Sequence, residues 1–446
     1  MEPGASLRVS PVKTHAANPP NEPSIPWLLM VAIMAFIAVY ITLDIGKLHA
    51  LRYGSDTGVF TQSLINFVRH GSTYNGAEHR PHLLVHDSWA ILLVSPLVAI
   101  WPHPETLLCL QVIAFGSAAA VLFAVAREFG CSSNVATIVA ILYLASPATQ
   151  GVAYDNITEN AYVPLLGFSL AWALQKRKMV LALVFAELLL GVKEDEAIFV
   201  AWIGILYAIW TNRRTGVIMT MLAISNGLLF LLLEHLNGSN PSIPSYHFGI
   251  DHPLDALFSI LAIALPFGFA PVTLGRRIFY ALPFVIELTS NNHWGSGTPL
   301  YTVGSHYVVP LATLVAIGAA QSIAKRPKIV RLAIPCTILA VLFLSPTPLR
   351  LGRWPYIVDP IAYSRALALR DSANSAVVSS DDEGAYAVAS SKLNLEIETG
   401  AMHHPCPAFN KNGRAFLASI GIGTWPRDVT LCGGVAVPRS SRTDPS

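Results

Sequence analysis

The sequence predicts an all-α polytopic membrane protein with about eleven transmembrane helices, juxtamembrane helices and a small extracytoplasmic C-terminal α/β domain. Hydrophobic residues make up 53% of the 446 and charged residues only 13%, with a mean hydropathy of +0.51. An ordinary soluble domain carries roughly 25% charged residues. The formal net charge of +2 gives no support for nucleic-acid binding, so no nucleic-acid partner is expected.

Several apolar runs approach the ~20 residues that cross a bilayer, and we expect the shorter ones to be partly buried by their neighbours. Residues 1–26 form a polar, predicted cytoplasmic tail, and residues 27–346 form the predicted membrane domain. The candidate spans are 27–45, 105–126, 133–153, 160–175, 179–192, 196–211, 216–234, 254–274, 278–289, 305–323 and 331–346.

Lys and Arg cluster at every second connection between these spans, which predicts that those connections are cytoplasmic. The connections between them are polar with little basic charge and are predicted to face outward. The basic clusters are at Arg127, 176–178, 213–214, 276–277 and 325–331, and the outward connections are around Asp155, around Lys193, at 235–253 and at 290–304.

The apolar run 88–101 would invert every later connection if it crossed the membrane. It is short, contains Pro96 and has a Trp near each end, so we expect an interfacial or re-entrant helix. The first outer loop then covers residues 46–104. Residues 347–446 form the extracytoplasmic tail, where alternating apolar stretches predict the α/β domain.

The first outer loop is dense in titratable groups. We expect Ser55 to cap a helix from Asp56 to about His70, with an apolar stripe that rests on the membrane. Asp56 would begin this helix near the bilayer surface. A purely structural role, as a first-turn carboxylate that favours the positive end of the helix dipole, is the alternative.

Two further clusters of charged residues lie at outward turns. If Asp155 and Glu159 occupy one helical turn, both carboxylates face the same way, although a solvated loop with a cap fits equally. Lys193, Glu194 and Asp195 lie between two apolar segments. Charges at membrane depth are costly unless they pair or face a wet cavity, but a tight polar hairpin is the simpler alternative.

The loop 290–307 contains Gly, Asn and aromatic residues, a composition typical of a flexible substrate-covering loop. Trp294 and Tyr301 could stack on a sugar or only anchor at the headgroup level. His306 and Tyr307 open the next span, where a histidine more often packs than binds a ligand.

Carboxylates from separate loops, together with Arg52, Arg80 and Lys193, predict an acid/base centre beside an anion-binding surface, as a lipid-phosphate donor requires. No spacing in the sequence is a metal-ligand motif, and a divalent metal is left open. Cys406 and Cys432 lie in the outward tail, where one disulfide can form if the two thiols approach each other.

The order of five motifs resembles the bacterial predicted-membrane-protein family called domain of unknown function 2079, over roughly residues 50–325. The motifs are D-T-G-V-F-T-Q-S-L-I-N from Asp56, H-D-S-W-A-I-L-L-V-S-P-L from His86, T-E-N-A-Y-V-P-L from Thr158, V-K-E-D-E-A from Val192 and S-H-Y-V-V-P from Ser305. That family in turn is similar to polyprenyl-phosphate-sugar glycosyltransferases of the GT-C fold.

The resemblance implies that Asp56 is the general base of glycosyl transfer and that Arg80 holds the donor phosphate. His86, Glu159 and the K-E-D run at Lys193 match family positions. Ile157, where a histidine is expected, and Asp87, in place of an apolar residue, depart from the pattern.

The resemblance thus predicts an inverting glycosyltransferase in the bacterial inner membrane, with its active site extracytoplasmic. Its partners would be a polyprenyl-phosphate-linked sugar, membrane lipids and a glycan, lipid or protein acceptor. Catalytic roles fall to Asp56, Asp155 and Glu159, phosphate binding to Arg52, Arg80 and Lys193, and substrate binding to His86, Glu194, Asp195, Trp294, Tyr301, His306 and Tyr307. A transporter or flippase for an envelope precursor, and a non-enzymatic envelope-assembly protein, are the alternatives.

Overall fold

The computed structural model describes residues 25–49, 53–236, 253–290 and 303–345, together with the backbone of four short strands in the tail. The membrane domain is mostly helical, as predicted. Its α-helices are α1 (Trp27–His49), α2 (Ser55–His70), α3 (Ser95–Ile100), α4 (Pro104–Glu128), α5 (Ser133–Ala145), α6 (Pro147–Ala153), α7 (Val163–Gln175), α8 (Met179–Leu190), α9 (Glu196–Trp210), α10 (Arg213–Leu236), α11 (Pro253–Ala264), α12 (Leu282–Ser290), α13 (Val309–Lys325) and α14 (Val330–Leu344).

Short 3-10 segments and one small hairpin connect these helices. The 3-10 segments are η1 (His82–Leu84), η2 (Trp89–Val94), η3 (Glu159–Tyr162), η4 (Leu265–Phe267), η5 (Ala270–Ala281), η6 (His306–Val308) and η7 (Pro327–Ile329). Strands β1 (Tyr74–Asn75) and β2 (Arg80–Pro81) pair antiparallel.

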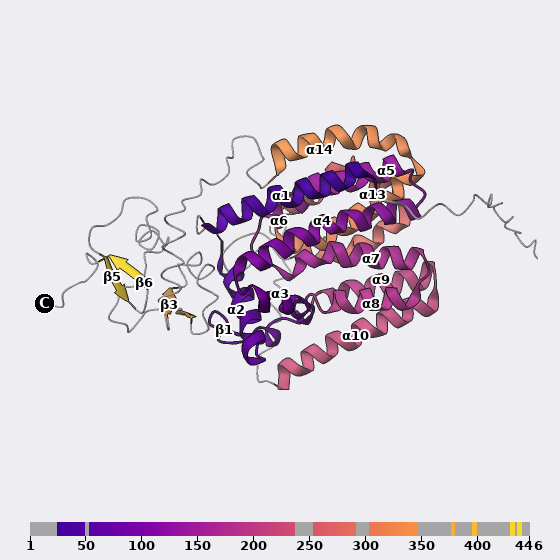
Figure 1. Cartoon of the computed structure of the whole chain (residues 1–446). Helices are drawn as coiled ribbons and strands as arrows, with labels where there is room; N and C mark the ends of the chain where they lie inside the picture. The colour runs from indigo at the N-terminus through magenta and orange to yellow at the C-terminus, as the bar shows by residue number, and fades with distance from the viewer. Residues whose placement is uncertain are drawn as a thin grey trace, which may run out of the picture.

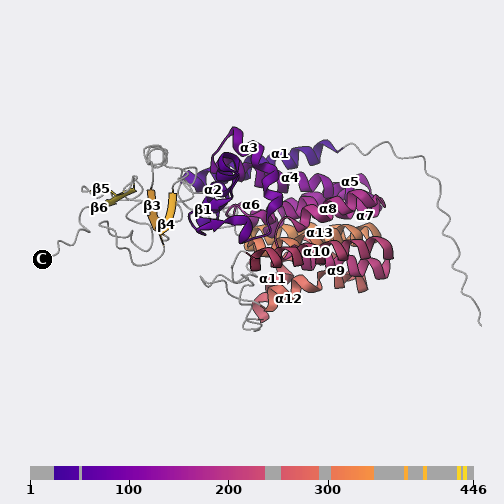
Figure 2. The ribbon, with the colours of Figure 1, turned by 90° about the horizontal axis from the view of Figure 1, so that it is seen from below.

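The long helices run side by side in a bundle, and α2, α3 and the β1–β2 hairpin gather at one end of it (Figure 1). Helix α4 packs on α1, α5 and α7, and α9 packs along α10. Seen from below, α11 and α12 lie on the side of the bundle away from α1 (Figure 2). This arrangement places the loops of the first outer segment beside the ends of several distant helices.

Helices α4 and α13 form the centre of the bundle. The buried share of the most apolar stretch is 61% in α4 and 67% in the segment that ends with α13. The corresponding share is 22% for each of α1, α10 and α14, which lie at the periphery. Large apolar side chains such as Trp27, Met221, Leu228 and Phe343 are exposed on these outer helices. An apolar surface of this extent is what a bilayer covers.

Within the described residues, five helices are long and apolar enough to cross a membrane, or six if the pair α5 and α6, bent by 53°, counts as one span. The predicted count of about eleven is therefore not supported. Apolar composition does not fix helix length: α8 has only 12 residues, α9 has 15, and the predicted span 254–274 breaks after Ala264. Gly268 and Phe269 adopt left-handed conformations at this break, which no continuous helix can contain.

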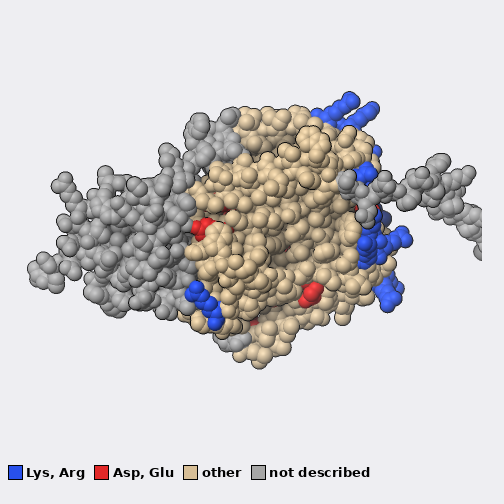
Figure 3. Space-filling view, in the orientation of Figure 1, with Lys and Arg blue, Asp and Glu red and all other residues tan. Residues whose placement is uncertain are grey.

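Lys and Arg residues gather at the end of the bundle opposite α2, as Figure 3 shows. We call this the basic end, and we call the end that carries α2, α3 and the β1–β2 hairpin the polar end. The gathering of Lys and Arg at one end agrees with the prediction that every second connection between the spans is basic and lies on the same side of the membrane. The predicted cytoplasmic clusters fall at the helix ends on this side: Arg127 in the last turn of α4, 176–178 between α7 and α8, 213–214 at the start of α10, 276–277 in η5 and 325–331 between α13 and α14.

The run 88–101 forms η2 and α3, two helices of six residues each. Neither approaches the length of a span, in agreement with the prediction that this run does not cross the bilayer. The segment packs on α2 and α4. The Ala90 backbone N–H donates to the Gly191 carbonyl at 2.7 Å, and the Trp89 ring lies against Gly191 so closely that a Cβ atom would not fit there.

The tail contains four described strands, β3 (Ala376–Ser379), β4 (Leu395–Glu398), β5 (Val429–Cys432) and β6 (Val435–Pro438). Strands β3 and β4 pair in parallel, and β5 and β6 antiparallel. These pairings alone do not support the predicted α/β domain. The sequence left a disulfide between Cys406 and Cys432 open, and both side chains lie outside the described residues. Cys109, Cys131 and Cys336 are free.

Helices α9 and α10 approach each other through glycines. A Cβ atom on Gly216 would collide with the backbone of Gly204 and Ala208, whereas on Gly227, in the same helix, it would meet only the Ala197 side chain at 3.4 Å. Small residues are what allows two membrane helices to pack this closely.

We therefore expect Gly216→Ala to destabilise the protein and Gly227→Ala to leave stability unchanged or raise it by up to ~1 kcal/mol, the usual helix-propensity gain of Ala over Gly. Thermal unfolding in detergent, followed by loss of the monodisperse peak in size-exclusion chromatography, measures both variants. Equal melting temperatures for the two would contradict the close backbone contact.

Candidate functional site

Helix α2 presents Asp56, which is exposed in its first turn. The prediction that Ser55 caps this helix is wrong: Gly54 occupies the cap position without a side-chain hydrogen bond, and its N–H donates to Asn156 Oδ1 at 2.7 Å. Ten consecutive residues from Thr57 to Asn66 are buried. Helix α2 is thus enclosed on both its apolar and its polar face instead of resting on lipid by one stripe.

The β1–β2 hairpin satisfies the polar face of α2. Gln62 Oε1 accepts from the Gly76 N–H at 2.8 Å, and Asn66 Nδ2 donates to the Tyr74 carbonyl at 2.7 Å. Directly after this hairpin, His82 at the start of η1 has its Nδ1 3.0 Å from the carboxylate of Glu78, which lies in the hairpin turn. Burial raises the pKa of Glu78, but His82, together with Asn75 and His86, outweighs burial and holds the pKa below its usual value.

A buried ion pair joins two turns at the polar end. Lys193 Nζ, between α8 and α9, lies 3.6 Å from Glu159 Oε1 at the start of η3, and the two side chains are 8% and 7% exposed. Burial opposes both charges, but Lys193, with weaker help from three histidines, keeps the pKa of Glu159 below its usual value. Likewise, burial lowers the pKa of Lys193, but Glu159, together with Asp195, Tyr307 and Glu194, outweighs burial and raises this pKa well above its usual value.

The neighbouring Glu194 pairs with His86 from the first outer loop, at 3.0 Å from His86 Nδ1. Burial opposes this pair as well, yet the carboxylate raises the pKa of His86, and the imidazole lowers the pKa of Glu194 to about 2. Asp195 has the opposite environment. Burial, reinforced by the charge of Glu194, raises its pKa to about 6.

Tyr307 connects these buried groups with Asp56. Lys193 Nζ stands 4.9 Å from the centroid of the Tyr307 ring. The Tyr307 hydroxyl interacts electrostatically with Asp56, Glu159 and Asp195 as well as with Lys193. His306 packs against Tyr307, with ring centroids 4.1 Å apart, and its carbonyl accepts from Asn160 Nδ2 at 3.3 Å.

The structure therefore brings together most of the residues predicted for the site. These residues are Asp56, His86, Glu159, Lys193, Glu194, Asp195, His306 and Tyr307. Within the described ranges, four buried polar atoms in this cluster or next to it have no hydrogen-bond partner: His82 Nε2, Asn160 Oδ1, Asp195 Oδ1 and Glu196 Oε1. Buried polar atoms of this kind are normally satisfied by water or by a ligand. No group of three or more His, Cys, Asp or Glu side chains in the described part of the chain is arranged to hold a metal ion.

Asp155 belongs to a different cluster. The prediction that Asp155 and Glu159 share a helical turn is wrong, because Thr158 between them is extended and caps η3 through its hydroxyl. Asp155 is instead held near Lys47, at the end of α1, whose Nζ donates to the Tyr154 carbonyl at 2.8 Å. Burial raises the pKa of Asp155, and Lys47 only partly opposes this. Its surroundings are those of a group that fixes the end of α1.

Arg80, in β2, is half-buried and forms no ion pair with any described residue. Arg52, Trp294 and Tyr301, which were predicted to bind phosphate or substrate, lie outside the described residues. Their predicted roles stay predictions.

The sequence interpretation did not assign Lys47, Glu78 or His82 to any site. Glu78 and His82 stand four residues apart in the charged stretch before Arg80, a spacing that could have indicated a pair. Lys47 stands three residues after Asp44, which is one of its electrostatic partners, but its contacts with Tyr154 and Asp155 span more than 100 residues and carried no signal in the sequence.

Comparison with known families adds one match. Residues 47–248 match the family model described as predicted membrane protein (DUF2079). This confirms the resemblance for α2, η2, α3 and the Lys193 turn, while the S-H-Y-V-V-P motif from Ser305 lies beyond the matched segment. No curated protein matches the chain. The family description and the apolar helices together describe a multi-pass membrane protein.

We expect Lys193→Met to lower the free energy of unfolding by about 3–5 kcal/mol, because it leaves the Glu159 carboxylate buried without its cation. The double variant Lys193→Met/Glu159→Gln should recover most of this loss. Denaturant unfolding in detergent measures both. The exposed pair Lys176–Glu128, with 2.7 Å between its charged atoms, provides the control, since Lys176→Met should cost under ~1 kcal/mol. No recovery in the double variant would contradict a direct pair.

The His86–Glu194 pair predicts a dependence of stability on pH. The contribution of His86, whose folded pKa is raised, is full below its ordinary value of 6.5 and is lost as pH rises through the folded pKa. The contribution of Glu194, whose folded pKa is lowered, is full above 4.5 and is lost as pH falls toward about 2. His86 and Glu194 therefore both contribute their full stabilisation only between about pH 4.5 and pH 6.5.

The difference in melting temperature between the native protein and Glu194→Gln should therefore be largest between about pH 4.5 and 6.5, and should shrink once pH exceeds the folded pKa of His86. A pH series of thermal melts measures it, with Glu128→Gln as the control, because the partner of Glu128 is a lysine. A difference that grew with pH above 6.5 would exclude the pairing with a charged histidine.

Proposed function

We propose that this protein is a membrane glycosyltransferase that moves a sugar from a polyprenyl-phosphate donor to an extracytoplasmic glycan, lipid or protein acceptor in the bacterial inner membrane. The observation that carries the proposal is the placement of the exposed Asp56 carboxylate at the polar end, electrostatically linked through Tyr307 to the buried Lys193–Glu159 pair. The reaction class rests on the resemblance of the sequence motifs to GT-C-fold enzymes and is part of the proposal. Topology supports the side, because the basic end is the one expected in the cytoplasm.

In the proposed reaction, Asp56 accepts the proton of an acceptor hydroxyl. The hydroxyl oxygen forms a bond to the anomeric carbon while the bond from that carbon to the phosphate oxygen breaks. The electron pair leaves with polyprenyl phosphate, and attack opposite the leaving group inverts the anomeric configuration. A general base needs to lie within hydrogen-bond reach of the proton and to be ionised near neutral pH, and a carboxylate exposed to solvent suits both conditions.

Arg80 is the better candidate for the donor phosphate among the described cations near the site. Lys193 is buried and its charge is already opposed by Glu159, whereas Arg80 has no ionic partner in the described ranges and its guanidinium can form paired hydrogen bonds with a phosphate. We assign Lys193 and Glu159 the task of holding the turn before α9 against η3. Arg52 remains a second proposed phosphate ligand.

The remaining groups would contact the sugar or the acceptor. His86, Glu194 and Asp195 lie together behind the ion pair, and His306 and Tyr307 complete that side of the site. Trp294 and Tyr301 are proposed to cover the sugar, and the tail 347–446 to help bind the acceptor. Asp155 is not retained as a catalytic group, because it is engaged near Lys47.

A transporter or flippase would require charged groups along a path through the membrane. All four ion pairs among the described residues lie instead at the two ends of the bundle: Glu78–His82, His86–Glu194, Lys193–Glu159 and Lys176–Glu128. This distribution favours chemistry at one surface over translocation.

Asp56→Asn should lower transfer about 100-fold or more, the usual contribution of a general base, without changing stability. The assay incubates membranes with polyprenyl phosphates that carry radiolabelled hexoses or pentoses and measures label in glycolipid and polymer. Asp255→Asn is the matched control, since Asp255 is also an exposed carboxylate in the first turn of a helix. Unchanged transfer by Asp56→Asn would remove this mechanism, and labelled donor moved across the membrane without transfer would favour the flippase.

A further inference from the structure

A large apolar cavity lies between α7, α9, α13 and the η5–α12 segment. Its volume is about 540 Å³, and its lining is mostly apolar. It extends along α9 from Glu196 in the first turn to Trp210 at the end of the helix. At 1.5 Å per residue this is a length of ~21 Å, which exceeds the ~15 Å that one leaflet contributes to the hydrocarbon core.

Three arginines stand where this cavity reaches the basic end: Arg177 after α7, and Arg276 and Arg277 in η5. All three are exposed, and none forms an ion pair with a described residue. Gly275, with φ of 59°, turns the chain just before the pair in η5. The guanidinium of Arg276 stacks over the Trp210 ring at 5.5 Å, which holds this cation at the mouth.

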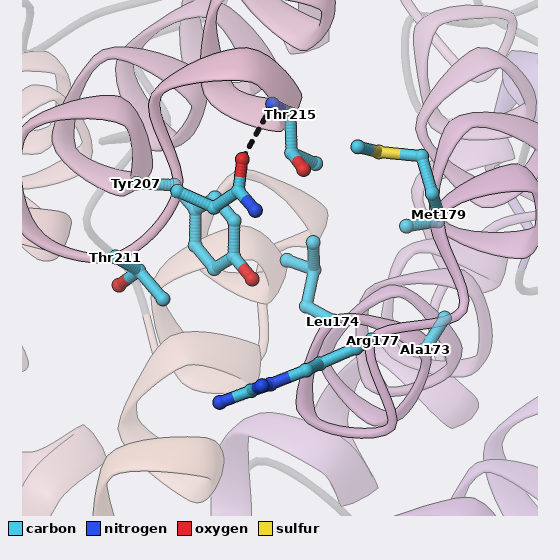
Figure 4. Close-up of a pocket in the computed structure, with 9 residues that line it drawn as sticks. Ala173, Leu174, Arg177, Met179, Tyr207, Thr211 and Thr215 are labelled. Atoms are coloured by element: carbon cyan, nitrogen blue, oxygen red, sulfur yellow. Dashed lines mark hydrogen bonds between the residues drawn. The ribbon is translucent and has the colours of Figure 1, made fainter.

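Aromatic and polar side chains surround the same mouth. The Tyr280 ring meets Trp210 edge-on with centroids 5.4 Å apart. A smaller hollow of about 250 Å³ adjoins the cavity and shares Leu174, Arg177, Tyr207 and Thr211 with it. In Figure 4 the Arg177 side chain extends beneath the Tyr207 ring, whose hydroxyl points toward it. The rim therefore combines cations, hydroxyl groups and the Trp and Tyr rings typical of the headgroup level.

We propose that this cavity is a binding site for an anionic phospholipid, with one acyl chain along α9 and the headgroup phosphate on Arg177, Arg276 and Arg277. The apolar lining excludes a free anion from most of the volume, and three unpaired guanidinium groups at one end select a negative headgroup over a zwitterionic one. The basic end is also the one expected at the cytoplasmic leaflet, which is rich in anionic lipid, and basic pockets between membrane helices on that side bind such headgroups. The site is separate from Asp56 and does not depend on the transfer reaction.

The test uses the full chain purified in neutral detergent and offered equal amounts of phosphatidylglycerol and phosphatidylcholine, with retained lipid counted by native mass spectrometry. We expect the native protein to retain one phosphatidylglycerol in preference to phosphatidylcholine. The triple variant Arg177→Gln/Arg276→Gln/Arg277→Gln should bind phosphatidylglycerol roughly 100-fold more weakly, at ~1 kcal/mol for each basic residue.

The matched control is Arg213→Gln/Arg214→Gln/Arg331→Gln, which removes the same charge from exposed arginines at the basic end that do not line the cavity. It should retain the lipid. A second variant, Ala281→Trp, fills the cavity while it keeps all three arginines and should abolish retention. Equal loss in the control, equal binding of the two lipids, or undiminished binding by Ala281→Trp would each overturn the proposal.

Discussion

The short turn between α8 and α9 holds the polar end of the molecule together, because within four residues it makes three contacts, two with the first outer loop and one with η3. The Gly191 carbonyl accepts from Ala90, Lys193 pairs with Glu159, and Glu194 pairs with His86. A charge that leaves water is stable only when a partner compensates it. The Lys193–Glu159 pair, which is the most buried of these contacts, therefore fixes η3 and α7 relative to α9, and the first outer loop closes over both.

This constraint also explains the two ends of the bundle. The membrane interior tolerates neither unpaired charge nor unsatisfied backbone, so charged groups are driven to the helix ends. At the basic end they stay exposed, where they can meet water or lipid headgroups. At the polar end the loops fold back over one another, so that Lys193 and Glu159 form a buried pair and His86 and Glu194 a partly buried one.

Helix α9 is the structural link between the proposed reaction site and the proposed lipid site. It begins directly after Asp195, and its first residue, Glu196, lines the apolar cavity whose other end is at Arg276 and Trp210. Its contact with α10 through Gly204 and Gly216 leaves the neighbouring face of α9, which carries Phe199, Ile203 and Tyr207, open to the cavity. The same helix thus carries a polar function at its start and an apolar, lipid-accessible surface along its length.

The sequence by itself determined the helical membrane class, the alternation of basic connections, the non-spanning run 88–101 and the candidacy of Asp56, Glu159 and Lys193. These features follow from local composition and from charge, which act within a few residues. Only the tertiary structure decided that Asp155 joins Lys47, that His86 meets Glu194 across more than 100 residues, and that several apolar runs are too short to span. Partner choice and helix length depend on packing between distant segments, and no periodicity in the chain encodes that packing.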